Sequence, residues 1–497
     1  MTSNLKNAKN LNGETTVPVF IGITQKAKNG EESLMNKPVR ITSIAEYVTY
    51  FGGAPATKFT ITTDSERKPD TETEFRVYDN DCRTGLKATL NGTRYTLYYS
   101  MILFFANGGG TCYVISVGSY NKTLSEIYRG SKDLILDKIR NEPDINLLVI
   151  PEAVNVEECM DIYNDLLNNL CDSGKYFAIL DIPNKKQEED NSAPEDIFRN
   201  VVSINNLRFA AAYYPWLETL ILSDNDIDEK VLVWDYTKEA DSSFFSGNEK
   251  LDLYIGECMT KLAGRNGVET DDIKQIKKTL HDRLSREWPL YNILAIKVKD
   301  YLNLFPPSAA IAGLYCATDK AYGIWKSTAQ IALSCVKNPK ECVDHERQTY
   351  LNSPVQGKSI NVIRAFPGEG TKVLNALTLD GNSPDCRYVN VCRTTIFIRQ
   401  TIKDIAYTYA SGPNDAVTWG RIKCLINNFL HDIWKRGGLA GALQEEAYSI
   451  HIGLCETMTD DDILKGIMRI TVMIAASHPA EFMEITVEQK MQPVNPC

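Results

Sequence analysis

Apolar residues recur every three or four positions between residues 414 and 436, the clearest periodic pattern in the chain. This spacing predicts a helix with one buried face. Asn414 or Asp415 can accept hydrogen bonds from the free N–H groups at its start, and Gly437 with Gly438 can end it. The apolar positions of this predicted helix are Ile422, Leu425, Ile426, Phe429, Leu430, Ile433 and Trp434.

The segment before this helix alternates between turns and short elements. Prolines and glycines predict two turns, at 366–370 and 380–384. The pattern predicts strands at 372–377 and 387–391, the second because polar and apolar residues alternate there. A helix is predicted over 394–409.

Short apolar runs alternate with amphipathic stretches in the middle of the chain. Runs at 147–151, 176–182 and 208–214 predict buried strands, and 155–171 predicts a helix with one apolar face. Strand–helix–strand spacing favours a partly parallel sheet with helices packed on it. The predicted fold class is α/β, mixed α+β over the whole chain.

Two further apolar runs lie near the N-terminus. Residues 17–23 predict a strand, and Pro18 belongs at a sheet edge or among the first residues of a strand, because proline cannot donate to a ladder. A second apolar run, 98–105, ends at three glycines that lead into a predicted strand at 112–117. Those glycines lack the following Lys and Ser or Thr of a phosphate-binding loop, so they are interpreted as the end of a helix.

The C-terminal run 483–488 alternates strictly between apolar and polar residues, which predicts a strand. Two pairings are open to it. It can pair within its own domain, which the pattern alone favours, or it can complete a sheet in a neighbouring molecule.

Other parts of the chain have weaker patterns. Residues 57–94 are polar and are expected to form an inserted surface segment or a small subdomain rather than core. Residues 337–362 have a less ordered pattern and are expected to join the helix that begins at 309 to the segment before residue 414. Within the poorly patterned stretch 218–303, residues 271–286 predict one amphipathic helix. The acidic run 224–229 lacks the glycine and the bidentate glutamate of a calcium loop, so a solvated loop is preferred.

Composition excludes several classes of protein. The 497 residues carry 54 basic and 64 acidic side chains, a formal charge of -10, which disfavours a general nucleic-acid-binding role. No apolar run reaches the length of a membrane span, and the start of the chain lacks a signal-peptide pattern. The 13 cysteines are scattered without a C-x-x-C motif, so mostly free thiols in a reducing cytoplasm are expected.

Candidate catalytic chemistry is sparse. Asp181 ends a predicted strand, where an α/β fold commonly places active-site residues, but no base, nucleophile or ligand accompanies it in a known spacing. The five histidines are far apart and form no metal-binding motif. We therefore predict no catalytic, cofactor-binding or metal-binding residue, and we prefer a capping or turn role for Asp181.

Several segments, in order along the chain, resemble contractile tail sheath proteins. These segments are "TVPVFIGIT", "YYSMILFFANGGGTCYVISVG", "YFAILDIP", "RFAAAYYPWLE", "PPSAAIAGLYCATDKAYGIWKSTA", "RAFPGEGTKVLNALTLDGN", "RYVNVCRTTIFI", "GPNDAVTWGRI", "GLAGALQEEAY" and "HPAEFMEITVEQKM". Sheath proteins of this family form the outer sleeve of contractile phage tails and related bacterial injection machines. The resemblance spans most of the chain and is weak at about 57–94 and 220–303.

The resemblance implies a domain organisation. A sheath-type core domain would combine 15–56 with 304–497, and 95–303 would be an inserted α/β domain with a variable region near 220–303. Residues 1–14 would form an N-terminal arm. Many sheaths begin with an extended "PGVYVEE"-like segment that this chain lacks, which leaves a crossing of that arm to a neighbour open.

The resemblance also implies a function. The chain would polymerise as stacked hexameric rings around an inner tube and contract from a metastable extended state, without a nucleotide or other cofactor. Its partners would be other sheath subunits, the inner tube protein, and baseplate and terminal cap proteins, with no nucleic acid and no direct membrane insertion. An α/β enzyme and a passive tube or shell protein are the alternatives.

The family also suggests which residues make the contacts. Residues 482–491 would act as an inter-subunit arm. The inter-subunit strand candidates are Val17, Val19, Ile21, Met483, Ile485 and Val487. The helix at 414–436 would lie near the inner wall, and its candidates for contacting the tube are Arg421, Lys423, Lys435 and Arg436, with helix-end charges in solvent as the alternative.

Overall fold

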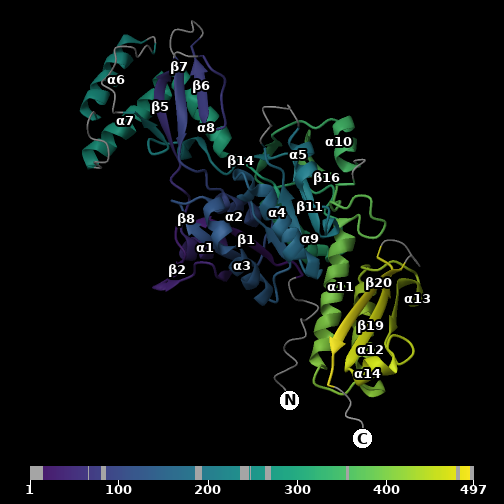
Figure 1. Cartoon of the computed structure of the whole chain (residues 1–497). Helices are drawn as coiled ribbons and strands as arrows, with labels where there is room; N and C mark the ends of the chain where they lie inside the picture. The colour runs from purple at the N-terminus through teal and green to yellow at the C-terminus, as the bar shows by residue number, and fades with distance from the viewer. Residues whose placement is uncertain are drawn as a thin grey trace.

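The computed structural model shows three lobes that follow one another along an elongated molecule (Figure 1). Helices and strands are mixed, and the strands form several separate sheets. The mixed α+β class expected from the pattern is therefore confirmed. The residues described are 15–64, 67–79, 85–184, 193–235, 246, 248–262, 270–353, 357–476 and 482–492. The expected N-terminal arm, 1–14, lies outside this range.

The central lobe is built on an eight-stranded sheet with the order β17–β16–β11–β10–β9–β1–β8–β4. Six neighbouring strands, from β16 to β8, run parallel, and the two edge strands β4 and β17 are antiparallel. The strands are β1 Pro18–Thr24, β4 Pro38–Ile41, β8 Cys112–Ser119, β9 Leu147–Val149, β10 Phe177–Asp181, β11 Ala210–Tyr214, β16 Ile360–Phe366 and β17 Gly370–Val373. The partly parallel sheet predicted from the middle of the chain is confirmed, and Pro18 is the first residue of its strand.

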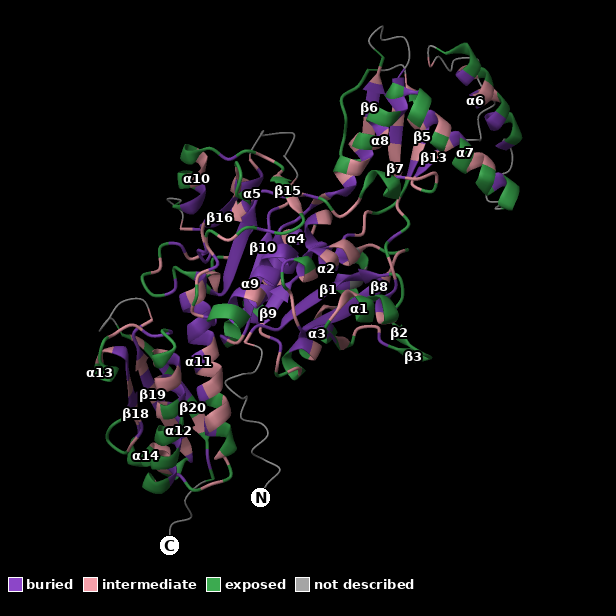
Figure 2. Ribbon diagram, turned by 180° about the vertical axis from the view of Figure 1, so that it is seen from behind, coloured by how far each residue is buried: buried purple, intermediate pink, exposed green. Residues whose placement is uncertain are grey.

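Helices cover this sheet, and its strands are the most continuously buried part of the molecule (Figure 2). Helix α9 (Ser308–Tyr322) packs against α2 (Leu97–Ala106) so closely that a Cβ on Gly313 would lie 2.4 Å from the carbonyl oxygen of Phe104. Only glycine fits there. The remaining helices of this lobe are α1 Ile44–Phe51, α3 Leu124–Asn141, α4 Cys159–Asn169, α5 Pro194–Val201 and α10 His345–Asn352.

A small three-stranded sheet, β14–β12–β15, lies where the central lobe meets the next lobe. Its strands are β12 Leu217–Thr219, β14 Leu304–Phe305 and β15 Val336–Pro339. Residues 337–362, expected from the sequence to be a joining segment, contain the end of β15, all of α10 and the start of β16. These elements are short or lack a clear apolar periodicity, so the sequence pattern did not predict them. A two-stranded hairpin, β2 Lys28–Asn29 with β3 Glu32–Ser33, is fully exposed.

The outer lobe combines two stretches that are far apart in the sequence. Its sheet has the order β13–β5–β7–β6 and carries three helices (Figure 1). The elements are β5 Lys58–Asp64, β6 Glu74–Tyr78, β7 Gly85–Asn91, β13 Leu232–Trp234, α6 Glu249–Leu262, α7 Asp271–Glu287 and α8 Pro289–Leu302. Phe59 and Ile61 of β5 are fully buried against this lobe's own helices. Residues 57–94 are therefore part of a small subdomain, one of the two expected alternatives, and they contribute buried residues to its separate core.

The C-terminal lobe contains two long helices and a three-stranded antiparallel sheet, β18–β19–β20. Its elements are α11 Val389–Thr408, α12 Ala416–Lys435, α13 Gln444–Ala447, α14 Asp460–Leu464, β18 Tyr448–His451, β19 Ile467–Ile474 and β20 Met483–Lys490. Helix α11 starts in the core of the central lobe, around Cys392 and Ile396, and ends in the core of the C-terminal lobe, around Ile402 and Ala406. It is the rigid connection between the two.

Helix α11 also corrects one prediction. A strand was expected at 387–391, but Val389 is the first residue of α11. Val389 and Val391 are both buried. The start of α11 is buried on nearly all sides, so its apolar residues can fall at alternate positions, as they would in a strand.

The domain division expected from the family differs from the structure. Strands β8 to β11, from the supposed inserted domain, share one sheet with β1 and β16 from the supposed core domain. The chain instead divides into the central lobe, an outer lobe that takes 58–91 and about 220–302, and a C-terminal lobe that begins within α11. Sequence pattern could not show this, because β11 and β16 become neighbours across more than a hundred intervening residues.

Candidate assembly interface

Strand β20 is the edge strand of the C-terminal sheet. All eight of its residues pair with β19, from Met483 opposite Ile474 to Lys490 opposite Ile467. The sheet order places no further described strand on its other side. The structure thus has an open backbone edge on the element that the sequence singled out.

The register shows which backbone groups face that open edge. The N–H of Met491 donates to the carbonyl oxygen of Gly466 at 2.7 Å, which makes this a hydrogen-bonded pair of the antiparallel ladder. Because such pairs alternate with non-hydrogen-bonded pairs, every second residue of β20 directs its N–H and C=O outward. These outward residues are Glu484, Thr486, Glu488 and Lys490.

The apolar side chains of β20 belong to the chain's own core. Ile485 and Val487 are buried beneath α11 and α12, and Met483 is partly buried beside them. An exchange that removed the whole strand would open that core. The candidates Met483, Ile485 and Val487 are therefore fixed within their own lobe in this structure, and what β20 offers a neighbour is its outer edge.

Strand β1 offers no such edge. Val19 and Ile21 pair with β8 on one side, and Val19 pairs with Leu148 of β9 on the other. Val17, directly before β1, donates its N–H to Oδ1 of Asn146 at 3.0 Å. The structure therefore does not support Val17, Val19 and Ile21 as inter-subunit residues, because both sides of their strand are occupied by the same chain.

Helix α12 is the predicted helix 414–436 with its expected ends. The Asp415 carboxylate accepts the N–H of Thr418 at 2.8 Å, and this bond lowers the pKa of Asp415. Of the seven apolar positions, five are buried and Trp434 is half-buried, whereas Leu425 is 42% exposed. Leu425 is therefore part of the outer face of α12, with Val417 and Arg421.

The four basic residues of this helix are all exposed but do not form one patch. Arg421 and Lys435 are 14 positions apart, or about 21 Å along the axis. Lys423 lies toward β18, where it lines a groove with Tyr448. Lys435 lies 5.0 Å above the ring of its neighbour Trp434.

Arg436 differs from the other three. Its guanidinium pairs with Asp432 at 3.6 Å and lies 5.1 Å above the ring of Trp325. It lines a cavity of about 360 Å³ between the central and C-terminal lobes, together with Asp319 and Lys320. Its contacts therefore join two lobes of one chain.

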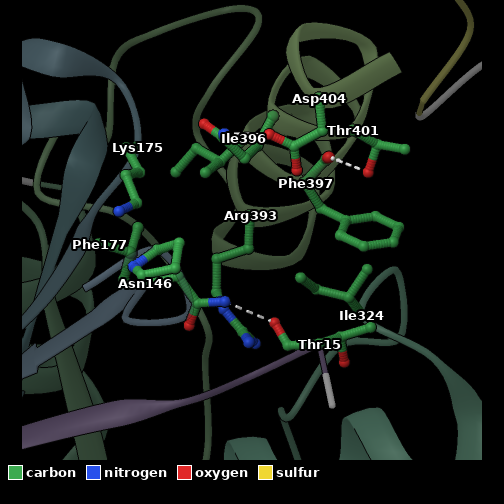
Figure 3. A pocket seen from close by; sticks show the side chains of 12 residues that line it. Thr15, Asn146, Lys175, Phe177, Ile324, Arg393, Ile396, Phe397, Thr401 and Asp404 are labelled. Carbon is green, nitrogen blue, oxygen red and sulfur yellow. Dashed lines mark hydrogen bonds between the residues drawn. The ribbon is translucent and has the colours of Figure 1, made fainter. Parts of the chain in front are cut away.

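A buried ion pair, which the sequence did not indicate, fixes the start of α11 on the central lobe. Arg393 donates to Asp319 of α9 at 2.6 Å, its side chain lies over the ring of Tyr315, and it also bonds the hydroxyl of Thr16. Thr16 in turn donates to Asp319. Figure 3 shows Arg393 in a pocket that Thr15, Asn146 and α11 line. Three segments that are more than 70 residues apart meet here, so no local motif could have shown the site.

Two other carboxyl groups are buried in the central lobe. Asp181, at the end of β10, accepts the N–H of Ser308 at 2.8 Å, where α9 begins. Glu152 accepts the N–H groups of Ile23, Thr96 and Leu97 at 2.7, 2.9 and 3.2 Å. Burial raises the pKa of each to about 7, while these hydrogen bonds act in the opposite direction. Both join helix starts to the sheet, as expected for capping groups.

The described residues contain neither a metal-binding cluster nor a membrane-spanning helix. Within that part of the chain, no group of three or more His, Cys, Asp or Glu side chains is placed to hold a metal ion. No helix in the same residues is both long enough and apolar enough to span a membrane.

Comparison with known proteins was informative only at the level of structure. No family model and no curated protein sequence matches the chain. The sheath complex of PVC, an extracellular contractile injection system, in its contracted state matches with 25% identity and a TM-score of 0.56, over 97% of this chain and 92% of that one. The helical sheath of the anti-feeding prophage (AFP) in its contracted state matches with 25% identity and a TM-score of 0.57, over 94% and 92%.

A chain of the contracted AFP baseplate has the same fold, with 22% identity and a TM-score of 0.60, over 95% of this chain and 93% of that one. The PVC and AFP sheath matches are sheath proteins of contractile injection systems, and the resemblance stated from the sequence is confirmed. The matches support a contractile tail sheath subunit and favour neither an enzyme nor a tube or shell protein.

Proposed function

We propose that this chain, a contractile tail sheath subunit, polymerises as stacked hexameric rings around an inner tube. Contraction from a metastable extended state drives the tube through a target envelope. The role is structural, without a catalytic step. Assembly takes place in the cytoplasm with baseplate and terminal cap proteins at the two ends.

The open edge of β20, in a chain with a sheath fold, carries this proposal. A strand of a neighbouring copy that pairs with this edge would satisfy the outward N–H and C=O groups of Glu484, Thr486 and Glu488. The C=O of Lys490 already accepts the side-chain amide of Gln489. Such a contact joins different surfaces of two identical chains, and repetition without closure builds a helical tube. Own-chain pairing of β20 and pairing to a neighbour are thus compatible, since they use opposite edges.

The rigid connection through α11 suggests how such a lattice could contract. The central and C-terminal lobes share this helix and the Arg393–Asp319 pair, so they would move together. Contraction would then repack rigid subunits between two arrangements while the strand contacts persist. The energy would be stored at assembly.

Contacts with the inner tube are assigned to the outer face of α12. Arg421 and Lys435 are the favoured residues because they are exposed and hold no ion pair among the described residues. Lys423 lies toward β18 and is secondary. Arg436, already paired with Asp432, would contribute least.

Electron microscopy of the purified chain, alone and with its tube protein, tests the proposal. Ridged hollow tubes of stacked six-fold rings are expected, with the tube protein present if a template is required. A chain that remains monomeric under both conditions would contradict it.

A further inference from the structure

Three cationic side chains lie together at the junction of the central and C-terminal lobes. Arg399 and Lys403 are one turn apart on α11, and Arg208 lies in the turn before β11. We call Arg208, Arg399 and Lys403 the cationic cluster. Among the described residues, none of the three forms an ion pair or a side-chain hydrogen bond to a carboxylate.

Arg399 is the most constrained member. Its Nε is buried and has no hydrogen-bond partner in the described part of the chain. The guanidinium lies against the turn after α4, where a Cβ on Gly174 would be 2.8 Å from Nη1 of Arg399. A half-buried guanidinium normally has its donors satisfied, so an unpaired one indicates a missing partner.

The members of the cluster also repel one another. Burial lowers the pKa of Arg399, and the charge of Arg208 lowers it further, while the thiols of Cys386 and Cys392 act in the opposite direction. Burial lowers the pKa of Lys403, and the charge of Arg399 adds to the effect. Asp404 acts in the opposite direction on Lys403. Bringing the three positive charges together therefore costs electrostatic free energy, and no described carboxylate within bonding distance offsets that cost.

Neighbouring carboxylates are engaged elsewhere. Asp404 accepts a hydrogen bond from Gln400 at 2.9 Å, and Asp172 accepts one from Asn206 at 3.4 Å. Neither lies within ion-pair distance of Arg399 or Lys403. Within the described part of the chain no carboxylate pairs with the cluster, so its charges are available to a partner from another molecule.

We propose that the cationic cluster is a docking surface for a carboxylate-bearing segment of a second copy of this chain. This inference rests on the proposed function, because a polymer brings copies together at high local concentration. The occupant is a second copy because the chain itself is acidic, with 64 acidic against 54 basic residues. Exposed carboxylates such as Asp460 and Asp461, at the start of α14, are of the required kind.

The cluster would act in assembly rather than in folding, and this separates it from a structural role. In the free subunit the three charges repel, so Arg399→Gln or Lys403→Gln should leave the thermal midpoint equal or a few degrees higher. In assembly, the same variants should raise the protein concentration needed for tube formation by about tenfold or more. Arg286→Gln, which removes an exposed cation from the outer lobe, is the matched control and should change neither quantity.

The occupant is identified by zero-length carbodiimide cross-linking of tubes assembled from equal amounts of ¹⁴N- and ¹⁵N-labelled chain. Mass spectrometry should find Lys403 joined to an Asp or Glu of a chain with the other label. A link from Lys403 to the tube protein, or only within one chain, would overturn the proposal. Normal tube formation by both variants would also overturn it, whereas failure of the unmodified chain to form tubes would count against the proposed function.

Discussion

The guanidinium of Arg393 in α11 and the carboxylate of Asp319 in α9 form an ion pair of 2.6 Å in the interior of the protein. Each side chain is at most 6% exposed. Burial lowers and the carboxylate raises the pKa of Arg393, with a net rise. The pair fixes the start of α11 on the central lobe, and through α11 it sets the position of the C-terminal lobe.

Removing one member of this pair should destabilise the protein strongly. Arg393→Leu leaves the Asp319 carboxylate buried without a countercharge, and we expect a loss of about 3–5 kcal/mol in urea unfolding. The double variant with Asp319→Leu should recover much of that loss, because the unpaired charge is also removed. Equal losses in the single and double variants would contradict a role of charge pairing.

Asp181 should make stability depend on pH. Its folded pKa, about 7, lies above the ordinary value of 3.8, so the folded state binds the proton more tightly than the unfolded state. The contribution of Asp181 to the free energy of unfolding is present at low pH and is lost as the pH rises through about 7. The thermal midpoint should thus fall between pH 5 and pH 8, and Asp181→Asn, which keeps an oxygen for the Ser308 N–H, should reduce that fall. Glu152, with a pKa also near 7, lowers the thermal midpoint over the same pH range. Because Glu152 is unchanged in the variant, part of the fall should remain.

A proline at the outward edge of β20 should separate folding from assembly. The N–H of Thr486 faces away from β19, so Thr486→Pro should cost the free subunit only about 1 kcal/mol or less. It removes a donor from the open edge, and we expect tubes to be lost in electron micrographs. Ile485→Pro is the matched control, because its N–H faces β19 and the variant should unfold the C-terminal lobe. Tubes formed by Thr486→Pro would exclude strand addition at this edge.

Charge reversal on the outer face of α12 should weaken binding to the inner tube protein without preventing assembly of the sheath. The double variant Arg421→Glu with Lys435→Glu changes two exposed side chains, of which Lys435 lies over the ring of Trp434. We expect sheath polymers to form, but co-sedimentation with the tube protein should weaken at least about tenfold, or about 1.4 kcal/mol. Lys250→Glu, an exposed cation of the outer lobe, should leave tube binding unchanged. Unaltered tube binding in the double variant would place the tube contact elsewhere.

Much of the local structure was predictable because it depends on neighbours in the sequence. The spacing of Ile422, Ile426 and Phe429, with Asp415 as cap, predicted α12 to within two residues at its start. The alternation at 483–488 predicted β20, and the preference of the pattern alone for own-domain pairing agrees with its ladder to β19. Failures occurred where burial was unusual, as at Val389, or where a pattern was short, as in β15.

Burial periodicity and capping act over a few residues, so the sequence by itself determined most helices and most strands. It also determined the acidic character that disfavours nucleic acid as a partner. The tertiary structure alone decided which strands are neighbours, since hydrogen bonding across a sheet ignores distance along the chain. It placed β1 between β8 and β9, left β20 with one open edge, and brought Thr16, Asp319 and Arg393 together. The cationic cluster has the same origin, because Arg208 meets Arg399 only after the chain has folded.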